Sequence, residues 1–285
     1  MSLSLFDLSG KKALVTGSAG GIGRACALAL AEGGADVAVV DLNKARADKT
    51  VAAIKALGRE AFFVRCDVAN KEDVEAMVAA VVERFGCLDI AINNAGMIGA
   101  KAPELELEQD NWERVIGVNL TGVWLCAQAQ AKQMVKQTPA GGKIINTASI
   151  AAVTACADGA YSAAKAGVVQ MTRSLAAQWG QYNINVNSFS PGSTRTPLMA
   201  SMTLEMQQQF RELTPLGHHL RPQDFAGVIV FMASAASDAM TGQNLVIDGG
   251  ITLNHLQTFQ PPRAIPPRLS PEEEASGLLE ELGEL

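Results

Sequence analysis

The sequence has few of the side chains that bind metal ions or build disulfide frameworks. It holds three histidines and five cysteines, an odd number, and no CxxC pair occurs. These scarcities disfavour both a zinc site and a disulfide scaffold. We therefore expect no bound metal and reduced, mostly buried thiols. The cysteines are Cys26, Cys66, Cys87, Cys126 and Cys156.

Long apolar runs and an excess of positive charge are missing too. No apolar run reaches the roughly 18 residues that a membrane-spanning helix needs, and the first residues lack the basic-then-apolar pattern of a signal peptide. We therefore expect a cytoplasmic protein without a membrane partner. The net charge is −6, whereas a general nucleic-acid binder usually carries a basic face, so nucleic acid is not an expected partner either.

The chain does have enough apolar material for a large core. Of its 285 residues, 48% are hydrophobic and 18% are charged, which disfavours global disorder. Short β-rich runs, from KALVTG near the start to NLVIDGG near residue 250, alternate with Ala-rich helical stretches such as 22–32, 44–57 and 73–85. Continuous apolar strands separated by helices predict a parallel sheet covered on both faces. We expect an α/β fold with a doubly wound, seven-stranded parallel sheet, in one domain over residues 1–254.

The composition changes after Leu253. Residues 255–285 hold five of the eleven prolines and form a Pro-rich and acidic C-terminal extension. Within it, Ser270 is placed to cap a short helix with an apolar stripe of leucines. Two interpretations stay open, a flexible acidic tail and an arm that packs on a neighbouring subunit.

A glycine-rich turn follows the first predicted strand and opens the first predicted helix, with the sequence TGSAGGIG from Thr16 to Gly23. Glycines let the backbone approach a pyrophosphate closely, and a helix N-terminus offers free N–H donors and a positive dipole end. No Lys-Ser/Thr pair follows, which disfavours a nucleoside-triphosphatase loop. In this strand–turn–helix context the turn predicts a dinucleotide site.

Asp41 ends the second predicted strand, 18 residues after Gly23. A carboxylate at this point can accept hydrogen bonds from the ribose diol of adenosine, and it would repel a 2′-phosphate. Lys44 and Arg46 lie nearby in the sequence and would act in the opposite sense. We expect NAD in preference to NADP. Asp41 would alternatively only cap the next helix, and the two roles are compatible.

Three residues in the middle of the chain suggest proton transfer. Tyr161 and Lys165 lie one turn apart on a helix predicted over 158–180, and Ser149 closes the fifth predicted strand. A nearby ammonium favours the phenolate of a tyrosine, whose pKa is ordinarily about 10. A phenol tuned in this way can pass a proton to or from an alcohol oxygen, which Ser149 would hold. Alone, such a Tyr–Lys pair is more often a solvated helix face, but the upstream dinucleotide turn favours the catalytic interpretation.

Residues 8 to 252 resemble the classical short-chain dehydrogenase/reductase family. The motifs that carry the resemblance are TGSAGGIG at 16–23, Asp67-Val68, Asn93-Asn94-Ala95-Gly96, Asn119 in VNL, Ser149, Tyr161 with Lys165, Pro191-Gly192 and IDGG at 247–250. The resemblance implies a Rossmann fold, reversible hydride transfer between an alcohol carbon and nicotinamide C4, and a homotetramer. The helices predicted over 106–136 and 158–180 are candidate interfaces.

The resemblance also implies roles for individual residues. Tyr161 would be the general acid/base, Ser149 would polarise the substrate oxygen, and Lys165 would lower the phenol pKa and bind the nicotinamide ribose. Asn119 would support a proton-relaying water, or hydrogen-bond at a helix bend, and both roles can hold at once. The implied cofactor-binding residues are Gly17, Gly20, Gly21, Ile22, Gly23, Asp41, Asp67, Val68, Asn94, Gly96, Tyr161, Lys165, Pro191, Gly192, Thr194 and Thr196.

The substrate is expected beyond the carboxyl ends of the strands, under a lid formed near residues 193–215. Its expected contacts are Ser149, Tyr161, Ile150 and Leu198. Arg195 would attract an anionic group or, as is usual for a lone arginine, lie solvated at the surface.

Three functions follow, in order of preference. The first is an NAD-dependent dehydrogenase acting on a polyol, a sugar or a small secondary alcohol. The second is a 3-oxoacyl thioester (acyl-carrier) reductase, although such enzymes commonly carry a basic residue in the glycine-rich turn, where this chain has Gly20, and use NADP. The third is a dinucleotide-binding scaffold without turnover, which would have no need of a tuned phenol.

Overall fold

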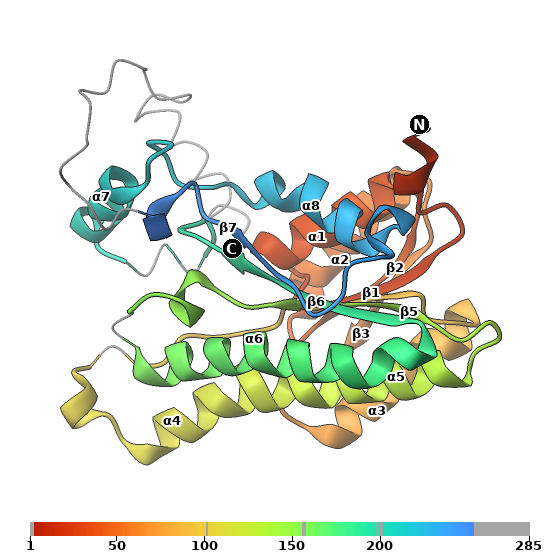
Figure 1. Cartoon of the computed structure of the whole chain (residues 1–285), viewed down its shortest axis with the longest axis horizontal. Helices are drawn as coiled ribbons and strands as arrows, with labels where there is room; N and C mark the ends of the chain where they lie inside the picture. Colours follow the sequence, from red (N-terminus) through yellow and green to blue (C-terminus); the bar gives the residue numbers. More distant parts are fainter. Residues whose placement is uncertain (1–2, 101, 156–157, 198, 200–201, 254–285) are drawn as a thin grey trace.

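The computed structural model describes residues 3–100, 102–155, 158–197, 199 and 202–253, and its centre is a parallel sheet (Figure 1). The seven strands lie in the order β3-β2-β1-β4-β5-β6-β7, and each pairs in parallel with its neighbours. The doubly wound fold class is confirmed. The strands are β1 Lys12–Thr16, β2 Asp36–Asp41, β3 Ala61–Arg65, β4 Ile90–Asn93, β5 Gly142–Thr147, β6 Ile184–Pro191 and β7 Asn244–Ile247.

Helices cover both faces of this sheet. Figure 1 shows α1, α2 and α8 on one side and α3, α5 and α6 on the other, with α4 leading into α5. Each face has its own buried apolar cluster. The helices are α1 Gly21–Glu32, α2 Lys44–Ala56, α3 Lys71–Phe85, α4 Gln109–Ile116, α5 Gly122–Lys136, α6 Gly159–Trp179, α7 Leu204–Leu213 and α8 Ala226–Ala233.

The strands read as continuous apolar runs because both of their faces are covered. In β1, Val15 packs in the cluster shared with α1 and α8, while Leu14 packs in the cluster shared with α3 and α5. Both side chains are fully buried, and burial of one such aliphatic side chain contributes about 1.5–3 kcal/mol. The alternation of the two clusters along each strand fixes its register.

The sheet order places the crevice. The chain adds β2 and β3 on one side of β1, and then returns to add β4 and the later strands on the other side. In such sheets a ligand binds beyond the carboxyl ends of the strands, where the order reverses. That point lies between the end of β1 at Thr16 and the end of β4 at Asn93.

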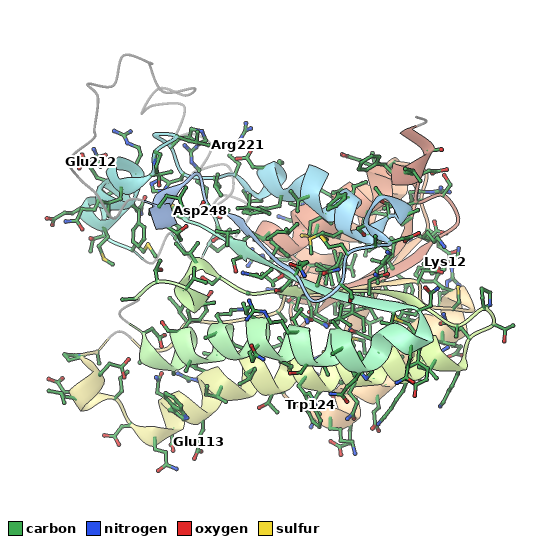
Figure 2. The ribbon with its side chains drawn as sticks, in the orientation of Figure 1. Lys12, Glu113, Trp124, Glu212, Arg221 and Asp248 are labelled. Carbon is green, nitrogen blue, oxygen red and sulfur yellow. The ribbon has the colours of Figure 1, made fainter. Side chains whose placement is uncertain are left out.

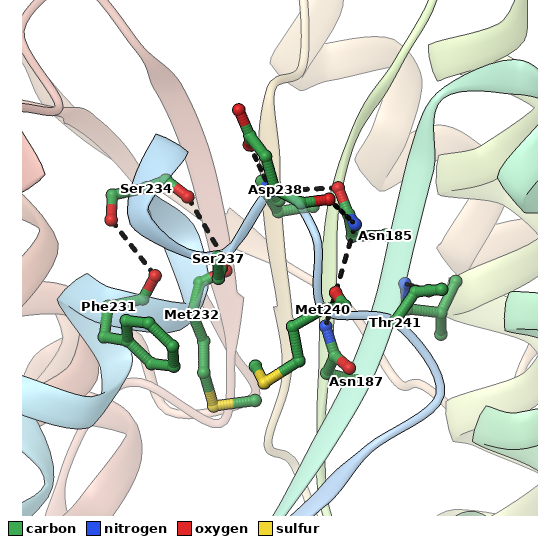
Figure 3. Close-up of polar contacts among 11 residues, drawn as sticks. Asn185, Asn187, Phe231, Met232, Ser234, Ser237, Asp238, Met240 and Thr241 are labelled. Carbon is green, nitrogen blue, oxygen red and sulfur yellow. Dashed lines mark hydrogen bonds and ion pairs between the residues drawn. The ribbon is translucent and has the colours of Figure 1, made fainter. Parts of the chain in front are cut away.

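Asparagine side chains fix the loop before β7 to β6 (Figure 3). Asn185 Nδ2 donates to the backbone oxygens of Asp238 and Met240, both at 3.0 Å, and Asn187 Nδ2 donates to the Met240 oxygen at 2.8 Å. Ser237 Oγ donates to the Met232 oxygen at 2.9 Å, which closes the end of α8. The loop therefore holds β7 at the sheet edge, with its carboxyl end directed to the crevice.

The helix expected over 106–136 differs in the structure. It is divided into α4 and α5 by a π-helical turn, Gly117–Thr121. Such turns are often found at functional sites, and this one contains Asn119.

Other expectations concern the thiols, the membrane and the C-terminus. Cys26, Cys66 and Cys126 are buried free thiols and Cys87 is half-buried, while Cys156 lies outside the described residues. Among the helices that the structure describes, none has the length and apolarity to cross a membrane. The extension expected over 255–285 lies outside the described residues.

Candidate active site

Ser149 lies just beyond the end of β5. Its backbone is extended, and it begins the short 3-10 turn Ile150–Ala152. The hydroxyl oxygen accepts a hydrogen bond from the Ala151 N–H at 3.1 Å. This contact fixes the hydroxyl at the carboxyl edge of the sheet, and the O–H remains able to donate. Ile150, the next residue, is half-buried.

Lys165 and Tyr161 lie together on the face of α6 that packs against β5. The Lys165 ammonium donates to the Thr147 oxygen at 2.9 Å and is 5.6 Å from the centroid of the Tyr161 ring. The lysine is only 3% exposed. Desolvation by this burial lowers the pKa of Lys165 to about 8. The spacing predicted from the sequence thus brings a cation beside the phenol ring.

The start of α6 is held by a residue that the sequence analysis did not single out. Asp158 caps the helix, since its Oδ1 accepts from the Tyr161 N–H at 2.8 Å. Its Oδ2 accepts from the Gly99 N–H, also at 2.8 Å. From the other side, Glu104 accepts from the Gly159 N–H. An aspartate three residues before Tyr161 signals a helix cap, but the second bond comes from a distant segment.

Asn119 is fully buried in the π-helical turn and bonds across to the segment after β4. Its Oδ1 accepts from the Met97 N–H at 3.1 Å, and its Nδ2 donates to the oxygens of Met97 at 2.8 Å and Val115 at 3.0 Å. A Cβ at Gly96 would lie 2.7 Å from Asn119 Oδ1 and 3.6 Å from Lys165 Nζ. The structure thus gathers Asn119 and Lys165 behind Gly96, and Asn119 does hydrogen-bond at a helix bend.

The glycine-rich turn is packed against the end of β4. Asn94 Nδ2 donates to the oxygens of Thr16 and Gly17, at 3.1 and 3.2 Å. Gly17 has a φ of +66°, and a Cβ there would lie 2.8 Å from the Ala95 Cα. A Cβ at Gly23 would lie 2.2 Å from the Gly17 oxygen. Only glycine fits these two positions, and the resulting close approach leaves the N-terminus of α1 open to a pyrophosphate.

Asp41 is bound to the same turn. Its Oδ2 accepts from the Ala19 N–H at 3.0 Å, and its Oδ1 accepts from the Asn43 N–H at 2.9 Å. The N-cap of α2 is Asn43, whose side chain accepts from the Arg46 N–H. The interpretation of Asp41 as only the cap of the next helix is therefore wrong.

The remaining cofactor candidates lie along the same edge of the sheet. Asp67 and Val68 follow β3, and the Asp67 N–H donates to Asp73 Oδ2 at 2.9 Å. Gly20 is the N-cap of α1, and Gly21 and the half-buried Ile22 form its first turn.

Residues beyond β6 reach the glycine-rich turn. Pro191 ends β6, and the Thr194 hydroxyl donates to the Gly192 oxygen at 2.9 Å. The methyl carbon of Thr196 lies 3.3 Å from the Cβ position of Gly21. Leu198, an expected substrate contact, lies outside the described residues.

The start of the segment expected to form a lid, 193–215, is hydrogen-bonded to residues just beyond its other end. The Arg195 N–H donates to the Leu220 oxygen at 2.8 Å, the Leu220 N–H donates to the Ser193 oxygen at 2.9 Å, and the Ser193 hydroxyl is 3.0 Å from His219 Nδ1. Arg195 is only 5% exposed, so the expectation of a solvated arginine is wrong. These bonds hold together the two ends of the loop that contains α7.

Comparisons with known proteins agree with this geometry. A family model described as Enoyl-(Acyl carrier protein) reductase matches residues 17–252. The chain belongs to the classical short-chain dehydrogenase/reductase family. It is 39% identical over 241 residues to the Cis-4-hydroxycyclohexanecarboxylate dehydrogenase of Sinomonas cyclohexanicum, covering 84% of this chain and 96% of that protein.

Two solved structures of the family extend the comparison. A short-chain dehydrogenase/reductase from Mycobacterium marinum is 39% identical, with a TM-score of 0.85 over 88% of this chain and 98% of its own. A gluconate 5-dehydrogenase from Burkholderia cenocepacia, solved with NADP and tartrate, is 36% identical, with a TM-score of 0.83 over 89% of this chain and 99% of its own. As a member of this family, the chain is an oxidoreductase that acts on CH–OH groups with a nicotinamide dinucleotide.

Proposed function

We propose that this dehydrogenase interconverts a secondary alcohol and its ketone with NAD in preference to NADP, and that its substrate is a polyol, a sugar or a small secondary alcohol. The observation that carries the proposal is the buried Lys165 ammonium beside the Tyr161 ring. Both lie at the sheet edge that also bears Ser149 and the glycine-rich turn. The related cyclohexanecarboxylate and gluconate dehydrogenases act on ring and sugar-acid alcohols according to their names.

The turn fits a dinucleotide because Gly17 and Gly23 have no side chain. A Cβ at either position would clash with backbone atoms, so only glycine allows the close packing of the turn. The N–H groups at the start of α1 would bind the pyrophosphate, and the Asp41 carboxylate would bind the ribose diol. When bound, the nicotinamide ring supplies or accepts the hydride. Thr194 and Thr196 border the place where that ring would lie.

The proton is handled by Tyr161. In oxidation its phenolate oxygen takes the proton of the substrate hydroxyl, and in reduction its phenol donates a proton to the carbonyl oxygen. The Ser149 hydroxyl already accepts from Ala151, and it donates its own hydrogen to the substrate oxygen. The Lys165 ammonium stabilises the phenolate by its charge. Asn119 keeps the Met97 backbone in place beside this group.

An oxidation screen with a matched tyrosine control tests the proposal. Sugar alcohols, hydroxy acids and simple secondary alcohols are offered with NAD and NADP in parallel. We expect turnover of one class with a higher kcat/KM for NAD. Tyr161→Phe should lower kcat by about 10²–10⁴-fold, the usual contribution of a general acid/base. Tyr182→Phe, at the chain's other and exposed tyrosine, should leave it unchanged. Near-normal turnover by a folded Tyr161→Phe protein would reject the scheme.

Two other functions are separated by the same assay. A 3-oxoacyl thioester reductase is favoured by the name of the matching family model, and disfavoured by Gly20 and Asp41 at the adenosine end of the site. It would oxidise NADPH with acetoacetyl-coenzyme A and ignore the alcohols. A scaffold would bind the dinucleotide but would convert neither the alcohols nor acetoacetyl-coenzyme A.

A further inference from the structure

A groove of about 290 Å³ lies between α3 and α5, which run side by side in the layer that covers one face of the sheet (Figure 1). Its floor is apolar, with Val74 and Val78 from α3 and Leu125 and Ala129 from α5. The two valines are buried and the two α5 residues are half-buried. None of the described residues that line the groove belongs to the candidate active site. An apolar groove between two helices is suited to the apolar face of a third helix.

The rim of this groove is basic. The exposed lysines Lys71, Lys132 and Lys136 lie along it, against the single carboxylate of Glu75 among the described lining residues. Lys71 pairs with Glu75 at 3.7 Å. Lys132 and Lys136 lie one turn apart on α5, and neither makes an ion pair with any residue that the structure describes. The groove therefore favours a helix that has one apolar face bordered by carboxylates.

The C-terminal residues of the same chain have this complementary pattern in their sequence. Residues 270–285 contain six glutamates and no basic residue. At helical spacing Leu278, Leu282 and Leu285 share one face, and Glu274 and Glu281 border it. These residues lie outside the described part of the structure. Both the apolar face and the charge match what the groove offers.

The residues between the described domain and this acidic segment are long enough for contact within one subunit. The last described residue is Leu253, just beyond β7 at the carboxyl edge of the sheet. The 16 residues 254–269 include four prolines, and at about 3.1 Å per residue a Pro-rich segment of this length spans about 50 Å. A domain of this size has a radius of gyration of about 18 Å. The span therefore suffices to pass from the sheet edge to the face formed by α3 and α5.

We propose that residues 270–285 dock as an amphipathic helix in the groove between α3 and α5 of their own subunit. The leucines cover the apolar floor, and the glutamates lie beside Lys132 and Lys136. Because these ion pairs are at the surface, the contact weakens as the salt concentration rises.

Cross-linking of the full-length protein with a carbodiimide tests this contact, because the reagent joins a carboxylate to an ammonium only where the two groups touch. Arg268 is the last basic residue of the sequence, so trypsin releases residues 269–285 as one peptide. We expect mass spectrometry to find this peptide linked to Lys132 or Lys136. The linked product should fall at least about fivefold in about 0.5 M NaCl. The measurement uses neither cofactor nor alcohol, so its outcome is independent of the function proposed above.

A double variant separates docking from mere reactivity. Leu278→Glu with Leu282→Glu keeps every reactive carboxylate and lysine but removes the apolar face. We expect the linked product to fall at least about tenfold, because carboxylates on an apolar floor are unfavourable. Leu256→Glu with Ile265→Glu is the matched control. It adds the same charge to the connecting residues and should leave the yield within about twofold of wild type.

The same segment of a neighbouring copy is the alternative occupant, and coexpression of two variant chains detects it. One chain carries Lys132→Gln with Lys136→Gln, and the other carries Gln at all six glutamates of 270–285. A link between the intact segment and the intact groove then joins two chains. The proposal is overturned if this link forms as readily as in wild type, if residues 269–285 link to neither Lys132 nor Lys136, or if the leucine variant links as wild type does.

Discussion

At the scale of single residues, the position of Lys165 beside the Tyr161 ring carries an energetic penalty. Its ammonium is almost completely buried and donates a hydrogen bond to the Thr147 oxygen. Burial lowers the pKa of Lys165 from its usual 10.5 to about 8. Such a lowering corresponds to ~3 kcal/mol of destabilisation wherever the lysine is charged in both states. Burying a cation beside Tyr161 therefore lowers the unfolding free energy of the protein.

This penalty predicts a particular pH dependence of stability. Between pH 8 and 10.5 the unfolded chain holds more protons on this lysine than the folded chain, so the penalty is full below pH 8 and disappears as the pH rises through this range. Lys165→Met carries no such group. We expect its unfolding free energy, relative to wild type, to fall by ~3 kcal/mol from pH 7 to 10.5, measured by urea unfolding of the cofactor-free protein.

Lys165→Met also loses the hydrogen bond to Thr147, and this loss changes the unfolding free energy equally at every pH. The test is therefore how the difference from wild type changes with pH, and not its size at any one pH. Lys132→Met removes an exposed lysine whose ammonium donates to Gln128, and it should show no drift against wild type. If the difference in unfolding free energy between Lys165→Met and wild type also stays constant with pH, burial does not lower the pKa of Lys165.

The sequence predicted the proximity of Tyr161 and Lys165 because one helical turn separates them. It also predicted that glycines form the turn, and a Cβ at Gly17 or Gly23 would meet backbone atoms at less than 3 Å. It did not predict that Arg46 lies against Gly20 or that Arg195 is buried. Both depend on how separate elements meet, which no local pattern records.

At the scale of elements, the N-terminus of α6 is joined to the segment after β4 by two carboxylates. Asp158 accepts from Tyr161 within its own helix and from Gly99 across the gap, while Glu104 accepts from Gly159 in the reverse direction. Asn111 of α4 adds a bond from the Ala100 N–H at 2.7 Å. The backbone beside Tyr161 is thus tied at two points to the segment after β4.

Asp158→Asn separates the two roles of this aspartate. An amide has one oxygen, so it can satisfy the N–H of Tyr161 or that of Gly99 but not both. An unsatisfied N–H costs about 1–3 kcal/mol, and we expect a loss of stability in this range. Hydrogen exchange should show faster exchange at one of these two amides, and at both in Asp158→Ala. Wild-type protection at both amides in Asp158→Asn would show that the two oxygens of Asp158 do not hold the N–H groups of Tyr161 and Gly99 together.

The strands were predictable from their apolar runs, and α6, expected over 158–180, forms at Gly159–Trp179. The π-helical turn was not predictable, since it depends on bonds from Asn119 to Met97, 22 positions earlier. The polar side chains inside β4 and β5 are a similar case. Asn93 donates to Gln130 and Asn146 at 3.1 and 3.0 Å, and these buried partners come from elements far apart in sequence.

At the scale of the whole molecule, the layer formed by α4, α5 and α6 has an outer side that carries large aromatic residues. Trp112 of α4 and Trp124 of α5 are 47% and 41% exposed, and Figure 2 labels Trp124 on the outside of this layer. Exposed aromatic side chains on a monomer point to an interaction surface. This is the surface that the sequence indicated for assembly, and we propose that it joins copies of the chain in a homotetramer.

Placing a charge in this surface tests the assembly. We expect the wild type to show a mass about four times 29.9 kDa by light scattering, and Trp124→Glu to shift it to smaller species, because an unpaired carboxylate in an apolar contact is strongly unfavourable. Leu57→Glu is the matched control, since Leu57 is similarly exposed but follows α2 in the opposite layer, and it should leave the mass unchanged. If the tetramer persists in Trp124→Glu, the copies meet through another surface, and the aromatic residues of α4 and α5 require a different partner.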